Sequence, residues 1–120
     1  MYGDGTAEEG GEDASHHGRR FVALERRDRA ADSTVLWDHY NVRHLCIDHP
    51  ERRIGRSDIE RVLCDPKRSD FEDVVRGNKV SVTRLPDGRW VLVGWHDWYG
   101  QRYPFHAREV SERFVRRLER

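Results

Sequence analysis

The sequence lacks the features of a membrane-spanning, disulfide-stabilised or zinc-binding protein. No apolar run approaches the about 18 residues that a transmembrane helix needs. The cysteines are Cys46 and Cys64, which form no CxxC pair and lie in no cluster of metal ligands. His39, His44 and His49 recur every five residues, a spacing that does not place three zinc ligands on one helix face. We therefore predict no metal or other cofactor.

The sequence also lacks a recognisable signal peptide. Two isolated cysteines and no recognisable signal peptide are typical of a reducing compartment, so we expect a cytoplasmic protein without a membrane partner.

Lysine is scarce: of the 22 basic residues, only Lys67 and Lys79 are lysines. Arginine binds phosphate through two parallel hydrogen bonds and keeps its charge at any working pH. A GC-rich genome would also explain the excess of arginine, so the ratio alone does not indicate a function.

The formal net charge of zero hides an uneven distribution. Residues 1–33 carry five arginines and eight acidic residues, a net charge of −3. Residues 34–120 carry 17 basic and 14 acidic residues, a net charge of +3. Within them, residues 75–120 carry ten basic and five acidic residues, a net charge of +5. A basic C-terminal half is compatible with a polyanionic partner.

Apolar residues make up only 36% of the chain and charged residues 37%, and the apolar ones are concentrated after residue 33. We expect residues 1–33 to be a disordered or weakly helical acidic leader. Residues 34–120 then form one folded domain, which is long enough to bury a core of its own.

Patterning and end signals predict the elements of this domain. Asp38 suits a helix N-cap, and Ser57 with Glu60 forms a capping-box pattern. Pro86 and Gly88 suit a tight turn between two strands that alternate with period two. The expected elements are a strand over 35–37, helices over 40–48 and 57–64, a loop over 67–78, strands over 80–83, 89–95 and 101–107, and a helix over 110–118.

This order predicts an α+β fold. Short connections favour antiparallel pairing, so the last three strands form a three-stranded meander. An N-terminal strand and two helices precede this meander and one helix follows it, and we expect the helices to pack on one face of the small sheet.

Several motifs along the domain resemble the BrnT-type ribonuclease toxins of bacterial toxin–antitoxin pairs. The opening motifs are Trp37-Asp38, Asn41, His44, His49, Ile54, Asp58-Ile59, Val62-Leu63 and Asp65-Pro66. The closing motif is Ala107-Arg108 followed by Ser111, Glu112 and Arg113. Two departures fall at one junction: Asp48 stands where the family often has lysine, and residues 51–53 are inserted.

The resemblance implies a RelE-like fold and a type II toxin. Members of the family are metal-independent endoribonucleases that inhibit translation by cleaving RNA. Their partner is a cognate DNA-binding antitoxin, and the promoter DNA is bound only through the complex. This is the function that we expect for the chain.

Metal-free RNA cleavage needs a base, an acid and a cation beside the phosphate. The candidate catalytic residues are Arg108 as the phosphate clamp, with His49 and His44 as acid and base. The alternatives are a salt bridge from Arg108 to Glu112, a packed helix histidine for His44, and a loop-anchoring histidine for His49. Two further histidines, His96 and His106, are weaker candidates for the same site.

Arginines and aromatic residues of the meander are the candidate RNA-binding residues. Bases of single-stranded RNA stack on exposed rings, and arginines bind the phosphates between them. The candidates are Arg84, Arg89, Arg102, Trp98 and Tyr99. Solvated strand ends are the alternative interpretation of the arginines. Because Asp48 replaces a basic residue, the alternative function is a non-catalytic RNA- or protein-binding module on the same fold.

Overall fold

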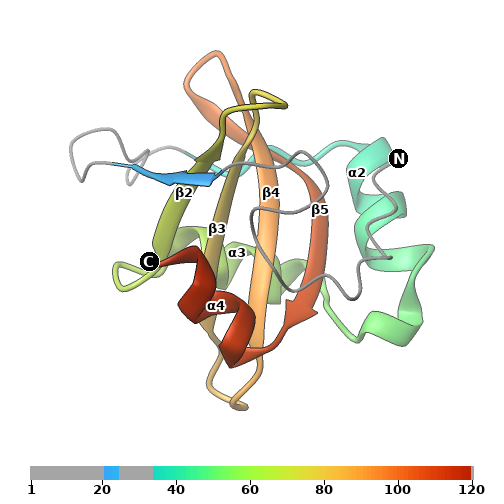
Figure 1. Cartoon of the computed structure of the whole chain (residues 1–120). Helices are drawn as coiled ribbons and strands as arrows, with labels where there is room; N and C mark the ends of the chain where they lie inside the picture. The colour runs from blue at the N-terminus through green and yellow to red at the C-terminus, as the bar shows by residue number, and fades with distance from the viewer. Residues whose placement is uncertain (1–20, 25–33, 120) are drawn as a thin grey trace.

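The computed structural model describes residues 21–24 and 34–119, which form an α+β domain (Figure 1). The strands are β1 (Phe21–Ala23), β2 (Ser69–Asp73), β3 (Lys79–Arg84), β4 (Trp90–Trp98) and β5 (Gln101–Val110). The helical segments are α2 (His39–Val42), the π-helix η3 (Arg43–Ile47), the 3₁₀ turn η4 (Pro50–Arg52), α3 (Arg56–Cys64) and α4 (Glu112–Leu118). No helix in these ranges is long and apolar enough to cross a membrane.

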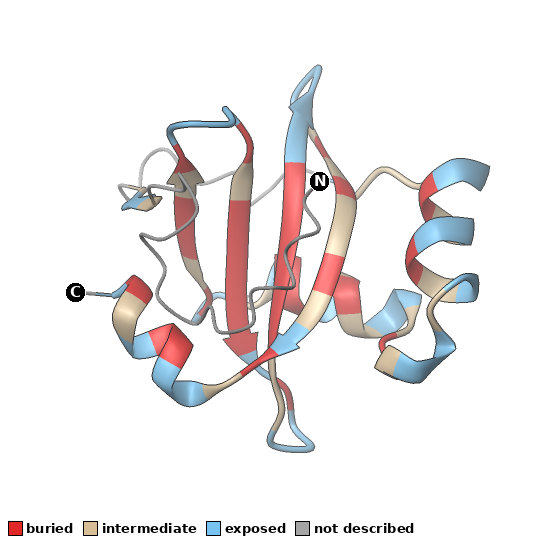
Figure 2. Ribbon diagram, turned by 45° about the vertical axis from the view of Figure 1, so that its right-hand side comes forward, coloured by how far each residue is buried: buried red, intermediate tan, exposed pale blue. Residues whose placement is uncertain are grey.

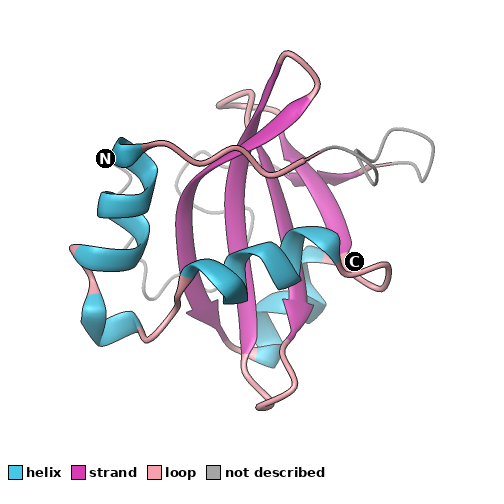
Figure 3. Ribbon diagram, turned by 180° about the vertical axis from the view of Figure 1, so that it is seen from behind, coloured by secondary structure: helices cyan, strands magenta, loops and turns pink. Residues whose placement is uncertain are grey.

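The five strands form one antiparallel sheet in chain order, β1-β2-β3-β4-β5. Helix α4 lies in front of this sheet in Figure 1 and α3 lies behind it, as the reverse view in Figure 3 shows. Helix α2 and η3 lie beside the outer edge of β5. Figure 2 shows buried residues along most of β3 and β4, because both faces of these strands are covered.

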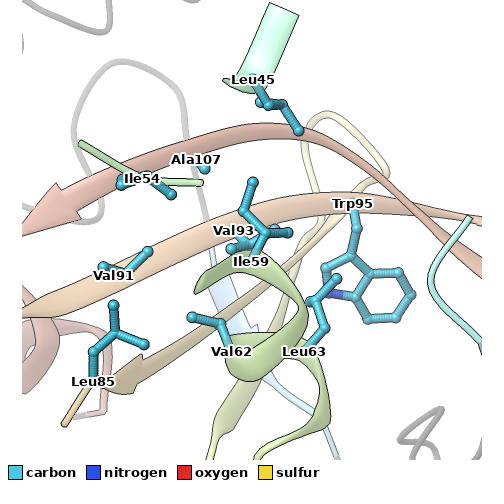
Figure 4. Close-up of a cluster of buried hydrophobic side chains, with 10 residues drawn as sticks. All are labelled: Leu45, Ile54, Ile59, Val62, Leu63, Leu85, Val91, Val93, Trp95 and Ala107. Carbon is cyan, nitrogen blue, oxygen red and sulfur yellow. The ribbon is translucent and has the colours of Figure 1, made fainter. Parts of the chain in front are cut away.

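The core on the α3 side is the larger of two apolar clusters. In Figure 4, three side chains of α3 point toward the side chains of β4. The cluster consists of Leu45, Ile54, Ile59, Val62, Leu63, Leu85, Val91, Val93, Trp95 and Ala107. Burial of this apolar surface attaches α3 and the segment before it to the sheet.

The core on the α4 side joins the C-terminal helix to β2, β3 and β4. Its members are Phe71, Val80, Val82, Leu92, Val110, Phe114, Val115 and Leu118. Ser111 caps α4 by accepting a hydrogen bond from the Phe114 backbone N–H at 3.0 Å. The helix therefore begins directly after β5 and folds back over the sheet.

The α+β class and the antiparallel meander are confirmed, but three details of the predicted fold are wrong. The helices do not share one face of the sheet, because the two faces of β4 are both apolar and each needs its own cover. The sheet has five strands, because residues 69–73 of the expected loop form β2 and residues 21–23 of the expected leader form β1. The rest of the leader prediction, residues 1–20 and 25–33, lies outside the described residues. The expected strand at 35–37 is reduced to one bridge between Val35 and Arg102.

A buried polar network explains why β2 was missed. Arg68 and Asp70 form an ion pair at 3.0 Å with almost no exposed side-chain surface. The Ser81 hydroxyl donates to Asp70 at 2.5 Å and accepts from the Trp95 indole N–H at 2.9 Å. These contacts pair charged and polar side chains inside the sheet. β2 is thus a buried strand with a polar sequence, and no apolar alternation marks it.

We predict that Asp70→Ala lowers the free energy of unfolding by about 3–5 kcal/mol, because it leaves the Arg68 guanidinium buried without its carboxylate. Urea-induced unfolding measures this loss. Glu109→Ala, which removes an exposed carboxylate of β5, is the matched control, and its effect is expected within about 0.5 kcal/mol. A loss below about 1 kcal/mol for Asp70→Ala would contradict the structural role of the pair.

Candidate functional site

Arg108 lies on the α4 side of the sheet. It pairs across the strands with Leu92, which belongs to the core under α4. Its guanidinium carbon lies 5.0 Å from the centre of the Phe114 ring, so the cation is held over an aromatic face. Arg108 therefore points away from the side of the sheet that α3 covers.

His44 and His49 lie on the segment that is anchored on the opposite side. Leu45, next to His44, is buried in the core under α3. The two imidazole rings meet edge to face at 5.3 Å, and His49 Nδ1 lies 3.2 Å from a carboxylate oxygen of Glu51. The structure thus brings the two histidines together but does not bring them to Arg108, so the three residues do not form one catalytic site.

Arg102 is not available to RNA, which corrects its predicted role. Its side chain is fully buried, and its guanidinium donates a hydrogen bond to the backbone carbonyl of Leu63. Burial, and secondarily the charge of Arg68, lowers the pKa of Arg102. The residue joins β5 to the end of α3 and belongs to the polar interior of the fold.

Arg84 and Arg89 flank the β3–β4 turn, as predicted, but Arg89 has a structural role there. Its guanidinium donates to Asp87 and to the Arg53 carbonyl, both at 2.8 Å, and only 16% of its side chain is exposed. Arg84 is exposed and donates to the Gly88 carbonyl at 3.3 Å. This turn lies at one end of the nine-residue strand β4, about 30 Å from the other end. The predicted arginines and aromatic residues therefore do not form one strip.

Trp98 and Tyr99 occupy the tip of the β4–β5 hairpin, where both are exposed as predicted. Trp98 is 56% exposed and Tyr99 91%, and their rings meet edge to face at 5.2 Å. Tyr99 and Gly100 have φ values of 51° and 82°. A two-residue hairpin loop with positive φ at both positions is a type I′ turn, for which asparagine or glycine is preferred at the first position. Tyrosine in this place is strained, and such strain is often retained for function.

The side chains between Trp98 and Arg108 form a site that the sequence motifs do not reveal. Alternation along β4 puts His96 and Gly94 on the same side as Leu92 and Trp98. Across from them, the pairing shifts between Gly94 and Trp95, so that β5 has one extra residue, Phe105. A bulge of this kind redirects side chains, and here it brings Phe105 onto the side of His106.

Contacts within this group are close. The His96 and Phe105 rings stack with centroids 4.3 Å apart. A Cβ atom on Gly94 would lie 3.3 Å from the Phe105 ring and 3.5 Å from the Cβ of His106, so glycine makes room for both side chains. We define the β4–β5 row as Trp98, Tyr99, His96, Phe105, His106 and Arg108. It runs along the part of the sheet that α4 leaves uncovered among the described elements (Figure 1).

The electrostatics of the row favour an anionic ligand with rings. Partial burial, and then the charge of Lys79, lowers the pKa of His96, so its imidazole is neutral at pH 7 and stacks without a charge. Arg108 supplies the cation at the α4 end. Within residues 21–24 and 34–119, no group of three histidine, cysteine or acidic side chains is placed to hold a metal ion.

The edge of β5 beside the row is held in place by α2. The Tyr103 hydroxyl lies 3.0 Å from both carboxylate oxygens of Asp38, which is the N-cap of α2. The pKa of Asp38 is lowered mainly by the hydrogen bond from the Asn41 backbone N–H, and the Tyr103 hydroxyl lowers it further. The Asn41 amide donates to the Pro104 carbonyl at 3.0 Å. These bonds fix the strand from which Phe105 projects.

Comparisons of the chain with protein-family models, curated proteins and solved structures give no match.

We predict that Tyr99→Asn raises the free energy of unfolding by roughly 0.5–1 kcal/mol, because asparagine tolerates the left-handed backbone that tyrosine resists. Urea-induced unfolding measures the gain. Tyr40→Asn is the matched control, since Tyr40 is 70% exposed on a helix, and it should give no gain. A Tyr99→Asn protein that is no more stable than the wild type would show that the turn is not strained.

Proposed function

We propose that this chain binds single-stranded RNA along the β4–β5 row. The observation that carries the proposal is that two ring pairs, Trp98 with Tyr99 and His96 with Phe105, share the α4 side of the sheet with the Arg108 guanidinium. Bases stack on exposed aromatic side chains whatever their sequence, and cations beside the rings bind the phosphates. The row contains both kinds of group.

The dimensions of the row suit a short single strand. From Leu92, which is paired with Arg108, to Trp98 is six residues along β4, or about 20 Å. That length accommodates a few stacked bases rather than one small ligand. Unpaired bases are also favoured over a duplex, because they can leave their own stack and lie on a protein surface.

Arg108 is the phosphate-binding residue of this proposal. The Phe114 ring below it limits the positions of the guanidinium and shields it from water on one side. The predicted alternative for Arg108 is a salt bridge to Glu112. In the structure the Glu112 carboxylate pairs with Arg116 instead, at 2.7 Å.

The resemblance to BrnT-type toxins remains the support for three finer predictions. These are the RelE-like arrangement of the fold, the role as a toxin that inhibits translation, and the DNA-binding antitoxin as a partner. RNA as the ligand has the additional support of the β4–β5 row.

Cleavage of the bound RNA is the second candidate function, and the two imidazoles of the row favour it. Neutral His96 would accept the proton of a ribose 2′-hydroxyl, whose oxygen attacks the phosphorus. The 5′-oxygen would leave with a proton from the His106 imidazolium, giving a 2′,3′-cyclic phosphate. These residues replace His44 and His49 in the mechanism, because they share a face of the sheet with Arg108.

We predict that Trp98→Ala weakens binding of a ten-nucleotide single-stranded RNA by about 5- to 100-fold, as the loss of one stacked base implies. Arg108→Ala should weaken it and also reduce its dependence on salt. Fluorescence anisotropy of a labelled oligonucleotide measures both effects.

Arg61→Ala is the matched control for Arg108→Ala, because it removes an exposed arginine of α3, on the opposite face of the sheet. Its affinity for the oligonucleotide should stay within about twofold of the wild type. Equal losses from Arg61→Ala and Arg108→Ala, or no effect of Trp98→Ala, would contradict binding along the row.

For cleavage, we predict that His96→Gln abolishes the appearance of cyclic-phosphate ends while oligonucleotide binding persists. Because burial, and then the charge of Lys79, lowers the pKa of His96 below its ordinary value of 6.5, more than half of the base is neutral at pH 6.5, and the acid limb of the rate profile should have its midpoint below that value. A doubly labelled RNA gives the rates. If the wild type and the His96→Gln protein, purified alike, cleave at the same rate, the chain is a binding module only.

A further inference from the structure

A second surface, on the α3 side of the sheet, is acidic. Helix α3 crosses this face above the β3–β4 turn (Figure 3), and a groove of about 750 Å³ lies between them. Its lining residues are Ser57, Asp58, Glu60, Arg61, Cys64, Asp65, Pro66, Leu85, Pro86 and Asp87. Four carboxylates and one guanidinium line this groove above a floor of leucine and proline. At its rim Arg89 pairs with Asp58 and Asp87, and Arg56 pairs with Glu60, so the groove together with these partners carries a net charge of −1.

Hydrogen bonds hold the carboxylates of the groove in fixed positions. Asp58 accepts from the Gly55 backbone N–H at 2.9 Å, and Glu60 accepts from the Trp37 indole at 2.7 Å. The Arg89 backbone N–H, then the Arg89 side chain, lowers the pKa of Asp87, which is therefore ionised at neutral pH. Each carboxylate has four lone pairs and retains acceptor capacity for an incoming cation.

The outer face of α4, on the other side of the sheet, has the complementary charge. Glu112, Arg113, Arg116 and Arg117 line a shallow depression there, with a net charge of +2. Arg116 is paired with Glu112, whereas Arg113 and Arg117 lie one turn apart and make no ion pair with any residue that the structure describes. Two like charges side by side on a helix are mutually destabilising, and a carboxylate from outside would relieve this.

We propose that copies of this chain associate head to tail, with the arginine face of α4 of one copy in the acidic groove of the next. Complementary charges on one molecule favour this contact, and a formal net charge of zero leaves no overall repulsion between copies. Because the two surfaces lie on opposite sides of the sheet, the contact is heterologous. A pair of copies joined in this way still has a free groove at one end and a free α4 at the other. Further copies can therefore add to both ends, and the assembly is an open polymer rather than a closed two-fold dimer.

The association is weak and electrostatic. Helix α4 has seven residues and is about 10 Å long, so the contact is smaller than the about 1,200 Å² that a stable interface buries. Surface charges of this kind are screened as the Debye length falls from about 20 Å to below 5 Å on adding salt.

Sedimentation velocity of the full chain tests the proposal. In about 20 mM salt, the average mass should rise with protein concentration up to about 1 mM, and in about 500 mM salt it should return to that of the monomer. The α4 variant Arg113→Glu should weaken the association at least tenfold. The control Arg43→Glu makes the same charge change on η3 and should leave the association within about twofold of the wild type.

Mixing two variants separates this arrangement from others. The groove variant, Ser57→Lys with Asp87→Asn, keeps an oxygen acceptor for the Arg89 backbone and has an intact α4. The Arg113→Glu variant has an intact groove. Alone, each should stay monomeric; together they have one complementary contact and should give a complex of two chains that does not grow.

Three outcomes would overturn the proposal. A chain that stays monomeric at about 1 mM in low salt has no such contact. A wild-type complex that stops at two copies is a closed dimer. If the mixture of variants, each shown to be folded by circular dichroism, does not associate while the wild type does, the contact involves other surfaces.

Discussion

The burial of β4 on both faces is the constraint on which the rest of the structure depends. From Val91 to Trp95 every residue of this strand is buried, with alternate side chains in the cores under α3 and α4. One sheet therefore needs a cover on each side. Neither helix covers the upper part of β4, where His96 and Trp98 turn toward solvent. The site is thus the continuation of the central strand beyond the core.

The same strand explains how an aromatic surface is built from few residues. Gly94 leaves space above β4, and the extra residue of β5 places the Phe105 ring in it, against His96. The core side of the hairpin holds Trp95, whose indole N–H bonds Ser81 inside the polar network. A single hairpin therefore has one face that stabilises the domain and another with rings for a ligand.

Much of the fold follows from patterning, because strong local signals agree with tertiary packing. The start of the period-two run of β4, the turn before it and the end of α3 at Cys64 agree with the prediction, but β4 continues three residues further than predicted, to Trp98. β2 was missed because buried Asp70 and its partners replace apolar residues, and a single sequence does not reveal such pairing. The predicted strand stops at residue 95, so it does not place His96 and Trp98 on one face, and the bulge at Phe105 depends on strand register, which the sequence does not show. The burial of Arg102 is a similar case, since an arginine in a strand is normally taken to be exposed.

The central claim is that RNA lies along the β4–β5 row, and a map of contacts tests it most directly. Backbone amide resonances of the labelled protein should shift on titration with single-stranded RNA at His96, Trp98, Phe105 and Arg108. Those of α3, on the opposite face of the sheet, should not move. Shifts confined to α3 or to the His44–His49 segment would contradict the account.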